Sequence, residues 1–321
     1  MSELLVGPSW LVDDLVRVED LMRATVGASE HRVVQDAALH LIKAGGKRLR
    51  PALVLISSRA GKAGATATDQ AAAAIELVHL ATLYHDDVID KTEVRRGAPT
   101  AHVLWGNEVA VLVGDYLFAC GCGLGARAKG DVPQLLADAI VNVCEGQITE
   151  TISLGDPHRP VDDYLATIRA KTAALFATGC ELGAHTSGAE DARPALRSYG
   201  ENLGMAFQVV DDLIDLVGDV RTTGKEPGTD LREGVFTAPL LLAAERDAAF
   251  AESLVSGERH LEGALEVLRS SGALHDAFEM AESFGADAVA SLSGLPEDEW
   301  TLTLEKVVKG VLAQLPELQL R

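Results

Sequence analysis

Apolar residues recur every three to four positions along most of the chain, the spacing that places them on one face of an α-helix. No stretch of useful length alternates apolar and polar residues as a β-strand does. Helices are predicted over residues 9–26, from 29 to the glycines at 45–46, shortly after Pro51, over 66–90, 108–127, 132–154, 162–186 and 193–216, and from about Thr237 onward. The pattern therefore predicts an all-α fold.

Two regions interrupt the helical pattern. Residues 92–107 contain glycine, proline and paired arginines and are predicted to form a loop. Residues 217–234 are too rich in glycine and proline for a helix, and a connection of that length usually serves as a functional lid or binding loop. No change in composition marks a linker and no repeat of fixed period is present. We therefore predict one domain spanning residues 1–321.

Two aspartate-rich segments with the same spacing stand inside the apolar helices at 66–90 and 193–216. Each has the pattern DDxxD, over residues 86–90 and 211–215. Residues four apart share a helix face, so the first and last aspartates of each segment point the same way. A single DDxxD segment is also typical of a helix cap or a solvated face, but two copies in apolar helices favour a site. We interpret them as two walls of one metal site.

Carboxylates this dense on a core-like helix repel one another and are costly to desolvate unless a cation lies among them. Oxygen-only ligands favour Mg²⁺, with Mn²⁺ as the alternative, and Mg²⁺ in proteins commonly joins a few carboxylates to substrate phosphates. The residues predicted to hold the metal are Asp86, Asp87, Asp90, Asp211, Asp212 and Asp215.

The net charge of −20 argues against nucleic acid or an anionic lipid surface as a partner.

The four cysteines lie in apolar helical patterns without metal-site spacing, so we expect reduced core residues of a cytoplasmic protein. No signal peptide is visible. The uncharged apolar run near residues 236–244 is far shorter than the ~20 residues of a membrane span, so no membrane insertion is expected.

Basic residues stand out against this acidic background. The segment GGKRLRP at 45–51 places three cations and flexible backbone at a junction between helices, an arrangement that suits phosphate. For Arg48 alone a solvated charge is the preferred interpretation. Arg95 and Arg96 follow the first aspartate segment, in a loop that can fold back over it. Together, the carboxylates and cations predict a pocket for a diphosphate.

The chain resembles the trans-isoprenyl diphosphate synthases, also called polyprenyl synthetases. The resemblance runs from residue 45 to 239, with motifs in family order: GGKRLRP (45–51), ELVHLATLYHDDVID (76–90), RRG (95–97), GD (114–115), EGQ (145–147), KT (171–172), FQVVDDLID (207–215) and GKEPGTDLREG (224–234). The resemblance implies a helical bundle around a central active-site cavity, and a homodimer. Many relatives carry lysine after the last glycine of this series, whereas this chain has Val235.

The resemblance also implies a mechanism in which an allylic diphosphate ionises and its cation adds to isopentenyl diphosphate. The residues expected to stabilise the departing pyrophosphate, with the metal, are Arg95, Lys171 and Lys225. Those expected to bind isopentenyl diphosphate are Lys47, Arg50, His79 and Arg96. Thr172 and Gln208 are expected to present dipoles to the cation. His79 lies on the same helical stripe as Asp86, two turns upstream, which favours ligand binding over a core role.

Product length is expected to depend on the helix before Asp86. Ala81 and Thr82 lie roughly 6–7.5 Å before the carboxylates along the helix axis, where short-chain relatives have an aromatic residue. The alanines at 71–74 allow either close helix packing or an open tunnel. With small residues at 81 and 82, we predict a long product, hexaprenyl to decaprenyl, for quinone side chains. Geranylgeranyl diphosphate is the main alternative product, and farnesyl diphosphate is less favoured.

Three other functions agree less well with the sequence. A terpene cyclase shares the first DDxxD segment, but cyclases usually replace the second and lack GGKRLRP. A non-catalytic partner subunit should have lost aspartates or basic residues, and this chain has lost neither. A calcium-binding structural protein is disfavoured because no EF-hand loop pattern is present.

Overall fold

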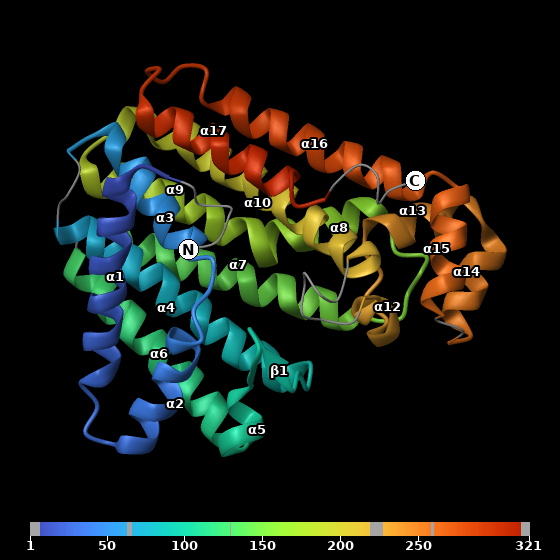
Figure 1. Ribbon diagram of the computed structural model, residues 1–321, viewed down its shortest axis with the longest axis horizontal. Coiled ribbons are helices and arrows are strands. Elements are labelled where there is room, and N and C mark those ends of the chain that lie inside the picture. Colours follow the sequence, from blue (N-terminus) through green and yellow to red (C-terminus); the bar gives the residue numbers. More distant parts are fainter. Residues whose placement is uncertain (1–6, 63–65, 129, 219–226, 258–259, 316–321) are drawn as a thin grey trace. The chain divides into compact units, whose positions relative to one another are not determined.

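The computed structural model describes residues 7–62, 66–128, 130–218, 227–257 and 260–315 (Figure 1). Helices make up nearly all the regular structure of these ranges, so the all-α prediction is confirmed. The contacts divide the chain into two compact units. Unit 1 comprises Met1–Ile140, Leu175–Gly200 and Gly294–Leu304, and unit 2 comprises Val141–Ala174, Glu201–Ser293 and Glu305–Arg321. The predicted single domain over 1–321 stays a prediction.

The elements wholly within unit 1 are α1 (Ser9–Gly27), α2 (Arg32–Lys43), α3 (Leu49–Ser57), the 3-10 turn η2 (Ser58–Ala60), α4 (Thr66–Ile89), β1 (Val94–Arg95), β2 (Ala98–Pro99), α5 (Ala101–Trp105), α6 (Asn107–Ala128) and the 3-10 turn η4 (Glu190–Ala192). Those wholly within unit 2 are α8 (Val161–Ile168), the π-helical turn η3 (Arg169–Ala173), α12 (Thr229–Glu233), α13 (Ala238–Arg246), α14 (Ala248–Val255), α15 (Leu261–Ser270) and α16 (Ala273–Ser291). Four helices contribute residues to both units: α7 (Val132–Ile152), α9 (Ala174–Ser187), α10 (Arg193–Val217) and α17 (Glu299–Leu312).

The long helices agree with the apolar periodicity, since the predicted 66–90, 108–127, 132–154 and 193–216 are observed as α4, α6, α7 and α10. The predicted loop at 92–107 was partly wrong, because it contains the hairpin β1–β2 and the short helix α5. The segment 217–234 also contains a helix, α12, after the glycine-rich part. Two-residue strands and five-residue helices are too short to produce a periodic pattern.

Helix α4 is the centre of unit 1, where it packs against α1, α3 and α6 (Figure 1). The alanines at 71–74 are all fully buried. Because four consecutive residues point to all sides of a helix, small side chains here let several neighbouring helices approach closely at once. Close packing therefore accounts for this alanine run.

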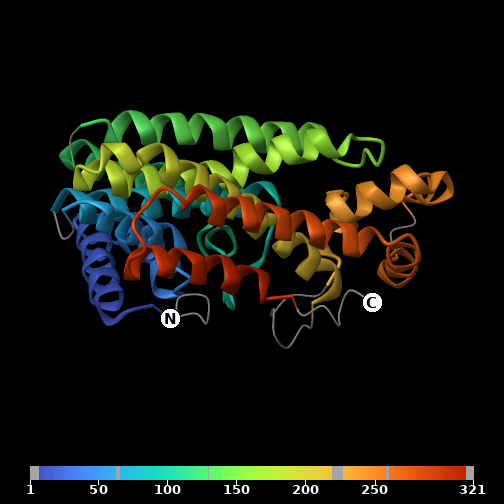
Figure 2. The ribbon, with the colours of Figure 1, turned by 90° about the horizontal axis from the view of Figure 1, so that it is seen from above.

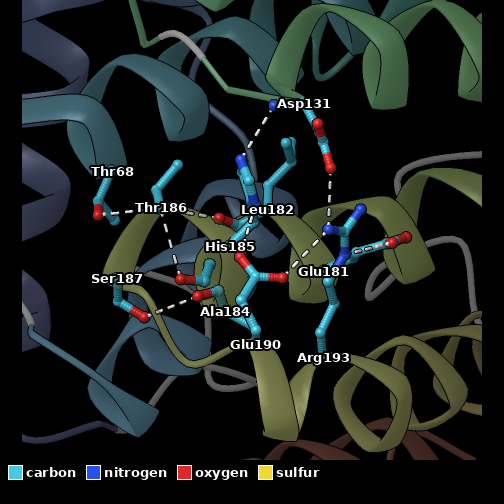
Figure 3. A network of polar contacts seen from close by, with 11 residues as sticks. Thr68, Asp131, Glu181, Leu182, Ala184, His185, Thr186, Ser187, Glu190 and Arg193 are labelled. Carbon is cyan, nitrogen blue, oxygen red and sulfur yellow. Dashed lines mark hydrogen bonds and ion pairs between the residues drawn. The ribbon is translucent and has the colours of Figure 1, made fainter.

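A polar network closes the turn between α9 and α10 in unit 1 (Figure 3). Nε2 of His185 accepts a hydrogen bond from the backbone N–H of Asp131 at 3.0 Å, so Nδ1 donates to Glu190 at 2.8 Å. Arg193 binds Glu181 at 2.8 Å and both Asp131 and Glu190 at longer distances. The network thus joins the start of α7 to the end of α9 and the start of α10.

In unit 2, α13 packs against α14, α15 and α16, in the orange part of the ribbon (Figure 2). The π-helical turn η3 interrupts the helical run between α8 and α9 and carries Lys171 and Thr172. π-Helical turns occur often at functional sites. The turn lies so close to α7 that a Cβ at Gly146 would come within 2.6 Å of the backbone nitrogen of Lys171. The glycine of the EGQ motif is therefore required by this close approach.

Within the described residues, α6 is the one helix long and apolar enough to cross a membrane by length and composition. It packs against α2, α4 and α5 inside unit 1, although Val111 and Leu112 on the same helix are exposed. The expectation that all four cysteines are core residues was wrong. Cys180 is buried, but Cys122 and Cys144 are exposed and Cys120 is intermediate. Their helices are apolar on more than one face, so the pattern did not show which face is covered.

Candidate active-site residues

The first aspartate motif ends α4. Asp86 is half-buried, Asp87 is 1% exposed, and Asp90 is exposed just beyond the last helical residue. The N–H of Asp90 still donates to the carbonyl of Asp86 at 2.8 Å, so the helical spacing of these two carboxylates is kept. Asp87 is turned inward and pairs with Arg95, whose Nε lies 2.6 Å from its Oδ1.

The hairpin β1–β2 brings both arginines of the RRG motif back to the helices, as the sequence predicted. Arg96 has a left-handed backbone conformation, with φ of 54°. Its guanidinium donates to the carbonyls of Leu41 and Gly45. It also lies flat against Gly46, where an added Cβ would be 2.7 Å from Cζ of Arg96. Because Gly46 has no Cβ, it leaves room for the guanidinium of Arg96.

Arg48 was expected to be a solvated charge, and this interpretation was wrong. Its side chain is 10% exposed and donates to Glu76 at 2.9 Å, where the carboxylate is 2% exposed. It also donates to the carbonyl of Ile42 at 2.9 Å. Arg48 has φ of 50°, a conformation that costs a non-glycine residue roughly 1–2 kcal/mol. The buried contacts of Arg48 hold the basic segment in this strained shape.

Arg50 and His79 form the centre of the basic cluster in unit 1. Nη1 of Arg50 lies 3.0 Å from Nε2 of His79, and its guanidinium carbon lies 4.8 Å from the centre of the Phe176 ring. Desolvation, Arg50 and Arg96 hold the pKa of His79 well below its usual value, so the ring is neutral and accepts the hydrogen bond from Arg50. Desolvation also lowers the pKa of Arg50 to about 10.

Nε of Arg50 is buried and has no hydrogen-bond partner among the described residues. A buried guanidinium with an unused donor is costly, and an anion would satisfy it. Lys47 is exposed at the same segment. The structure therefore places Lys47, Arg50, His79 and Arg96 within unit 1, in chemistry that suits a diphosphate.

The predicted chain-length residues lie on α4, before the aspartates. Ala81 is 1% exposed. Thr82 is half-buried, and its hydroxyl donates to the carbonyl of His79 at 2.8 Å. Their role in product length stays a prediction.

The second aspartate motif lies on α10 in unit 2. Asp211 is exposed, whereas Asp212 is 4% exposed. Both oxygens of Asp212 accept hydrogen bonds, from Tyr164 at 2.5 Å and from Gln208 at 2.7 Å. Burial raises the pKa of Asp212 to about 7. The hydrogen bonds from Tyr164 and Gln208 lower this pKa, and the charges of Asp211 and Glu150 raise it.

The KT motif contacts the same region of unit 2. The hydroxyl of Thr172 donates to Oε1 of Gln208 at 2.8 Å. Nζ of Lys171 donates to the carboxylate of Glu150, on α7. The motif that was expected to serve the departing pyrophosphate is thus held beside the second aspartate motif. Lys225 lies outside the described residues.

Asp215 has a contact that the sequence did not reveal. Its carboxylate accepts from the backbone N–H of Thr229 at 3.3 Å and of Asp230 at 3.1 Å, at the start of α12. Burial, then Asp215, Asp212 and Asp211 hold the pKa of Asp230 well above its usual value. Asp230 therefore joins the carboxylates of unit 2. Asp230 belongs to the motif GKEPGTDLREG (224–234), but no spacing in the sequence relates it to α10.

The donor set fits a hard divalent cation, because it consists of carboxylates whose repulsion a cation would relieve. Across the ranges that the structure describes, no three His, Cys, Asp or Glu side chains are grouped closely enough to hold a metal ion by themselves. Mg²⁺ usually completes its coordination with water and substrate phosphates, so a few carboxylates suffice. That both motifs hold one metal cluster stays a prediction.

Comparison with known proteins identifies the family. A model described as polyprenyl synthetase matches residues 31–266. A nonaprenyl diphosphate synthase of Mycobacterium tuberculosis is 39% identical over 292 residues, which make up 88% of this chain and 87% of the relative. The chain therefore belongs to the polyprenyl synthetase family.

Solved structures agree. A decaprenyl diphosphate synthase of Rhodobacter capsulatus has a TM-score of 0.90 at 36% identity, covering 96% of this chain and 98% of that one. A polyprenyl synthase of Caulobacter crescentus, described as complexed with calcium and isoprenyl diphosphate, has a TM-score of 0.89 at 37% identity, covering 95% of each chain. The predicted enzyme class, a prenyltransferase that makes polyprenyl diphosphates of the long-chain type, is confirmed.

Proposed function

We propose that this protein condenses isopentenyl diphosphate with an allylic diphosphate and repeats the step until an all-trans product of hexaprenyl to decaprenyl length is made. The observation that carries this proposal is the basic cluster of unit 1. Arg50 is desolvated, paired with a neutral His79 and left with an unused donor. Such a group binds a diphosphate with little rearrangement.

In the proposed reaction, Lys47, Arg50, His79 and Arg96 bind isopentenyl diphosphate, which keeps its diphosphate throughout. The allylic carbon–oxygen bond breaks, and the alkene of isopentenyl diphosphate attacks the allylic carbon. The new carbon–carbon bond forms between the alkene and the allylic cation left when pyrophosphate departs, and a pyrophosphate oxygen takes the proton that is lost. Each cycle adds one five-carbon unit.

The aspartates of the two motifs would hold Mg²⁺, with Mn²⁺ as the alternative. When bound, Mg²⁺ supplies positive charge to the leaving diphosphate. Arg95, Lys171 and Lys225 would add positive charge, which stabilises the transition state more than the ground state because the pyrophosphate gains charge as it leaves. Thr172 and Gln208, which are joined by a hydrogen bond within unit 2, would present dipoles to the allylic cation.

We also propose that the enzyme acts in the cytoplasm as a homodimer and supplies quinone side chains. The family resemblance supports the dimer. α6 packs against α2, α4 and α5 within unit 1, so its length and apolar composition alone do not indicate a membrane span. Sedimentation of the purified protein tests the oligomeric state.

The test of function is incubation of the purified protein with isopentenyl diphosphate, farnesyl or geranylgeranyl diphosphate and Mg²⁺, followed by chromatography of the dephosphorylated products. We expect chains of hexaprenyl to decaprenyl length. Asp86→Ala and Asp211→Ala should each reduce turnover by about 100-fold or more, the scale on which a lost electrostatic contact acts in catalysis. Product that stops at geranylgeranyl would favour the alternative product. A cyclic hydrocarbon made without isopentenyl diphosphate would contradict the proposal.

A further inference from the structure

Tyr164 makes a contact with the second aspartate motif that the sequence did not predict. Its side chain belongs to α8 and is buried, with 3% of the residue exposed. The hydroxyl donates to Oδ2 of Asp212 at 2.5 Å. The two residues are 48 positions apart in the chain but both belong to unit 2.

The other oxygen of Asp212 is held by a chain of hydrogen bonds whose direction is fixed. Thr172 donates to the carbonyl oxygen of the Gln208 side chain, so the amide nitrogen of Gln208 donates to Oδ1 of Asp212, at 2.7 Å. Asp212 therefore has one donor on each carboxylate oxygen. A carboxylate anchored at both oxygens cannot turn about its terminal bond without losing a contact.

We propose that Tyr164 is a positioning residue that fixes the carboxylate of Asp212 for metal binding at the second aspartate motif. Each carboxylate oxygen has about two acceptor sites, and the donors from Tyr164 and Gln208 occupy one on each oxygen. The orientation in which these two hydrogen bonds hold the carboxylate decides where its other two acceptor sites can bind a cation or the water of that cation. This inference rests on the proposed function, because it concerns the same metal site.

The test compares Tyr164→Phe, which removes one hydroxyl and keeps the ring, with Tyr199→Phe. Tyr199 is fully buried, and its hydroxyl donates to a backbone carbonyl, that of Leu304 at 2.8 Å, within unit 1. Two readouts are needed: the Mg²⁺ concentration for half-maximal activity, and the affinity for Mn²⁺ measured by paramagnetic resonance without substrate.

For Tyr164→Phe we expect a weakening of Mn²⁺ affinity and a rise in the Mg²⁺ requirement of about 10-fold or more, the scale of a lost hydrogen bond to a charged group. The KM for isopentenyl diphosphate should stay within about 2-fold, because that substrate is assigned to unit 1. Tyr199→Phe should lower thermal stability and leave both metal readouts unchanged. Equal metal affinities in the two variants would overturn the proposal.

A double-mutant cycle distinguishes an effect of Tyr164→Phe that acts through Asp212 from a general effect on folding. In Asp212→Asn the anchored carboxylate is gone, so adding Tyr164→Phe should cause no further loss of Mn²⁺ affinity. Additive losses would contradict a positioning role. Because Mn²⁺ binding is measured without turnover, a wild-type protein that makes no polyprenyl diphosphate would overturn the proposed function while the role of Tyr164 is still decided by the binding data.

Discussion

The side chain of Arg95 donates a hydrogen bond to Asp87 across 2.6 Å, which ties the hairpin after the first aspartate motif to the motif itself. The side chain of Asp87 is 2% exposed and the side chain of Arg95 is 21% exposed. This pair gives Arg95 a structural role in addition to the proposed one at the leaving pyrophosphate. The two roles predict different effects of mutation.

Arg95→Met should lower the free energy of unfolding by roughly 3 kcal/mol, because it leaves a buried carboxylate without its cation. The double variant Arg95→Met/Asp87→Asn should recover most of that stability, since the buried charge is removed as well. Neither variant should recover activity if Arg95 also serves the leaving group. Chemical denaturation and steady-state kinetics measure the two effects, and full activity in the double variant would contradict both the role of Arg95 at the leaving group and the role of Asp87 at the metal.

Glu76 supplies a buried negative charge to a cluster of arginines. It binds Arg48 at 2.9 Å and also raises the pKa values of Arg50 and Arg96, which burial lowers. Glu76→Gln should therefore lower the free energy of unfolding by about 3 kcal/mol. The matched control is Asp276→Asn, which breaks the exposed pair with Arg246 and should cost less than about 1 kcal/mol. Equal losses in denaturant titrations would mean that the Glu76–Arg48 pair is not a buried anchor.

His79 predicts a dependence of stability on pH. Its pKa in the folded protein lies well below the ordinary 6.5, because desolvation and the neighbouring arginines disfavour the charged ring. The unfolded chain takes up a proton near pH 6.5 that the folded chain does not bind. The free energy of unfolding therefore has its full value above pH 6.5 and decreases as the pH falls below 6.5, because the unfolded chain then gains a proton on His79.

His79→Gln should remove this pH dependence of the free energy of unfolding, and the glutamine side chain still offers Arg50 a hydrogen-bond acceptor. Between about pH 6 and 5, the stability of the wild type should fall more steeply than that of the variant, by at most about 1.4 kcal/mol per pH unit. Urea titrations over this range measure the difference. Parallel curves for the two proteins would show that His79 takes up its proton in the folded state.

The long helices were predictable from sequence because each places an apolar stripe against a core over several turns. The motifs were also predictable, since their residues are close together in the chain. The direction in which a side chain points within a motif could not be predicted. Arg48 lies between Lys47 and Leu49, and its left-handed backbone turns it toward Glu76, which no periodicity shows.

Contacts between distant segments were equally hidden. Tyr164 is one of several apolar positions of its helix, and only the folded chain brings its hydroxyl to Asp212. The carboxylate of Asp215 likewise accepts from backbone N–H groups of Thr229 and Asp230, 14 and 15 positions further along the chain. Such contacts arise from tertiary packing rather than from local propensity, and so they carry no signal in a single sequence.

Ala81→Phe tests whether α4 limits product length. The residue is 1% exposed, and five positions separate it from Asp86, about 7.5 Å along the helix axis. If hydrocarbon fills the space beside Ala81 during elongation, the ring should fit there with a stability loss below about 1 kcal/mol and should shorten the product to about four isoprene units.

If protein atoms fill that space instead, the same ring must displace them, and overpacking should cost about 1–3 kcal/mol without a change in product length. Thr82→Phe is the companion variant, since Thr82 is half-buried and one position nearer the aspartates. It should stop growth at an equal or shorter length. Mass spectrometry of the dephosphorylated products and thermal unfolding of both variants separate these outcomes. A destabilised Ala81→Phe that still makes the wild-type product would assign Ala81 to helix packing, because a side chain that lines the path of the growing tail cannot be enlarged without meeting it.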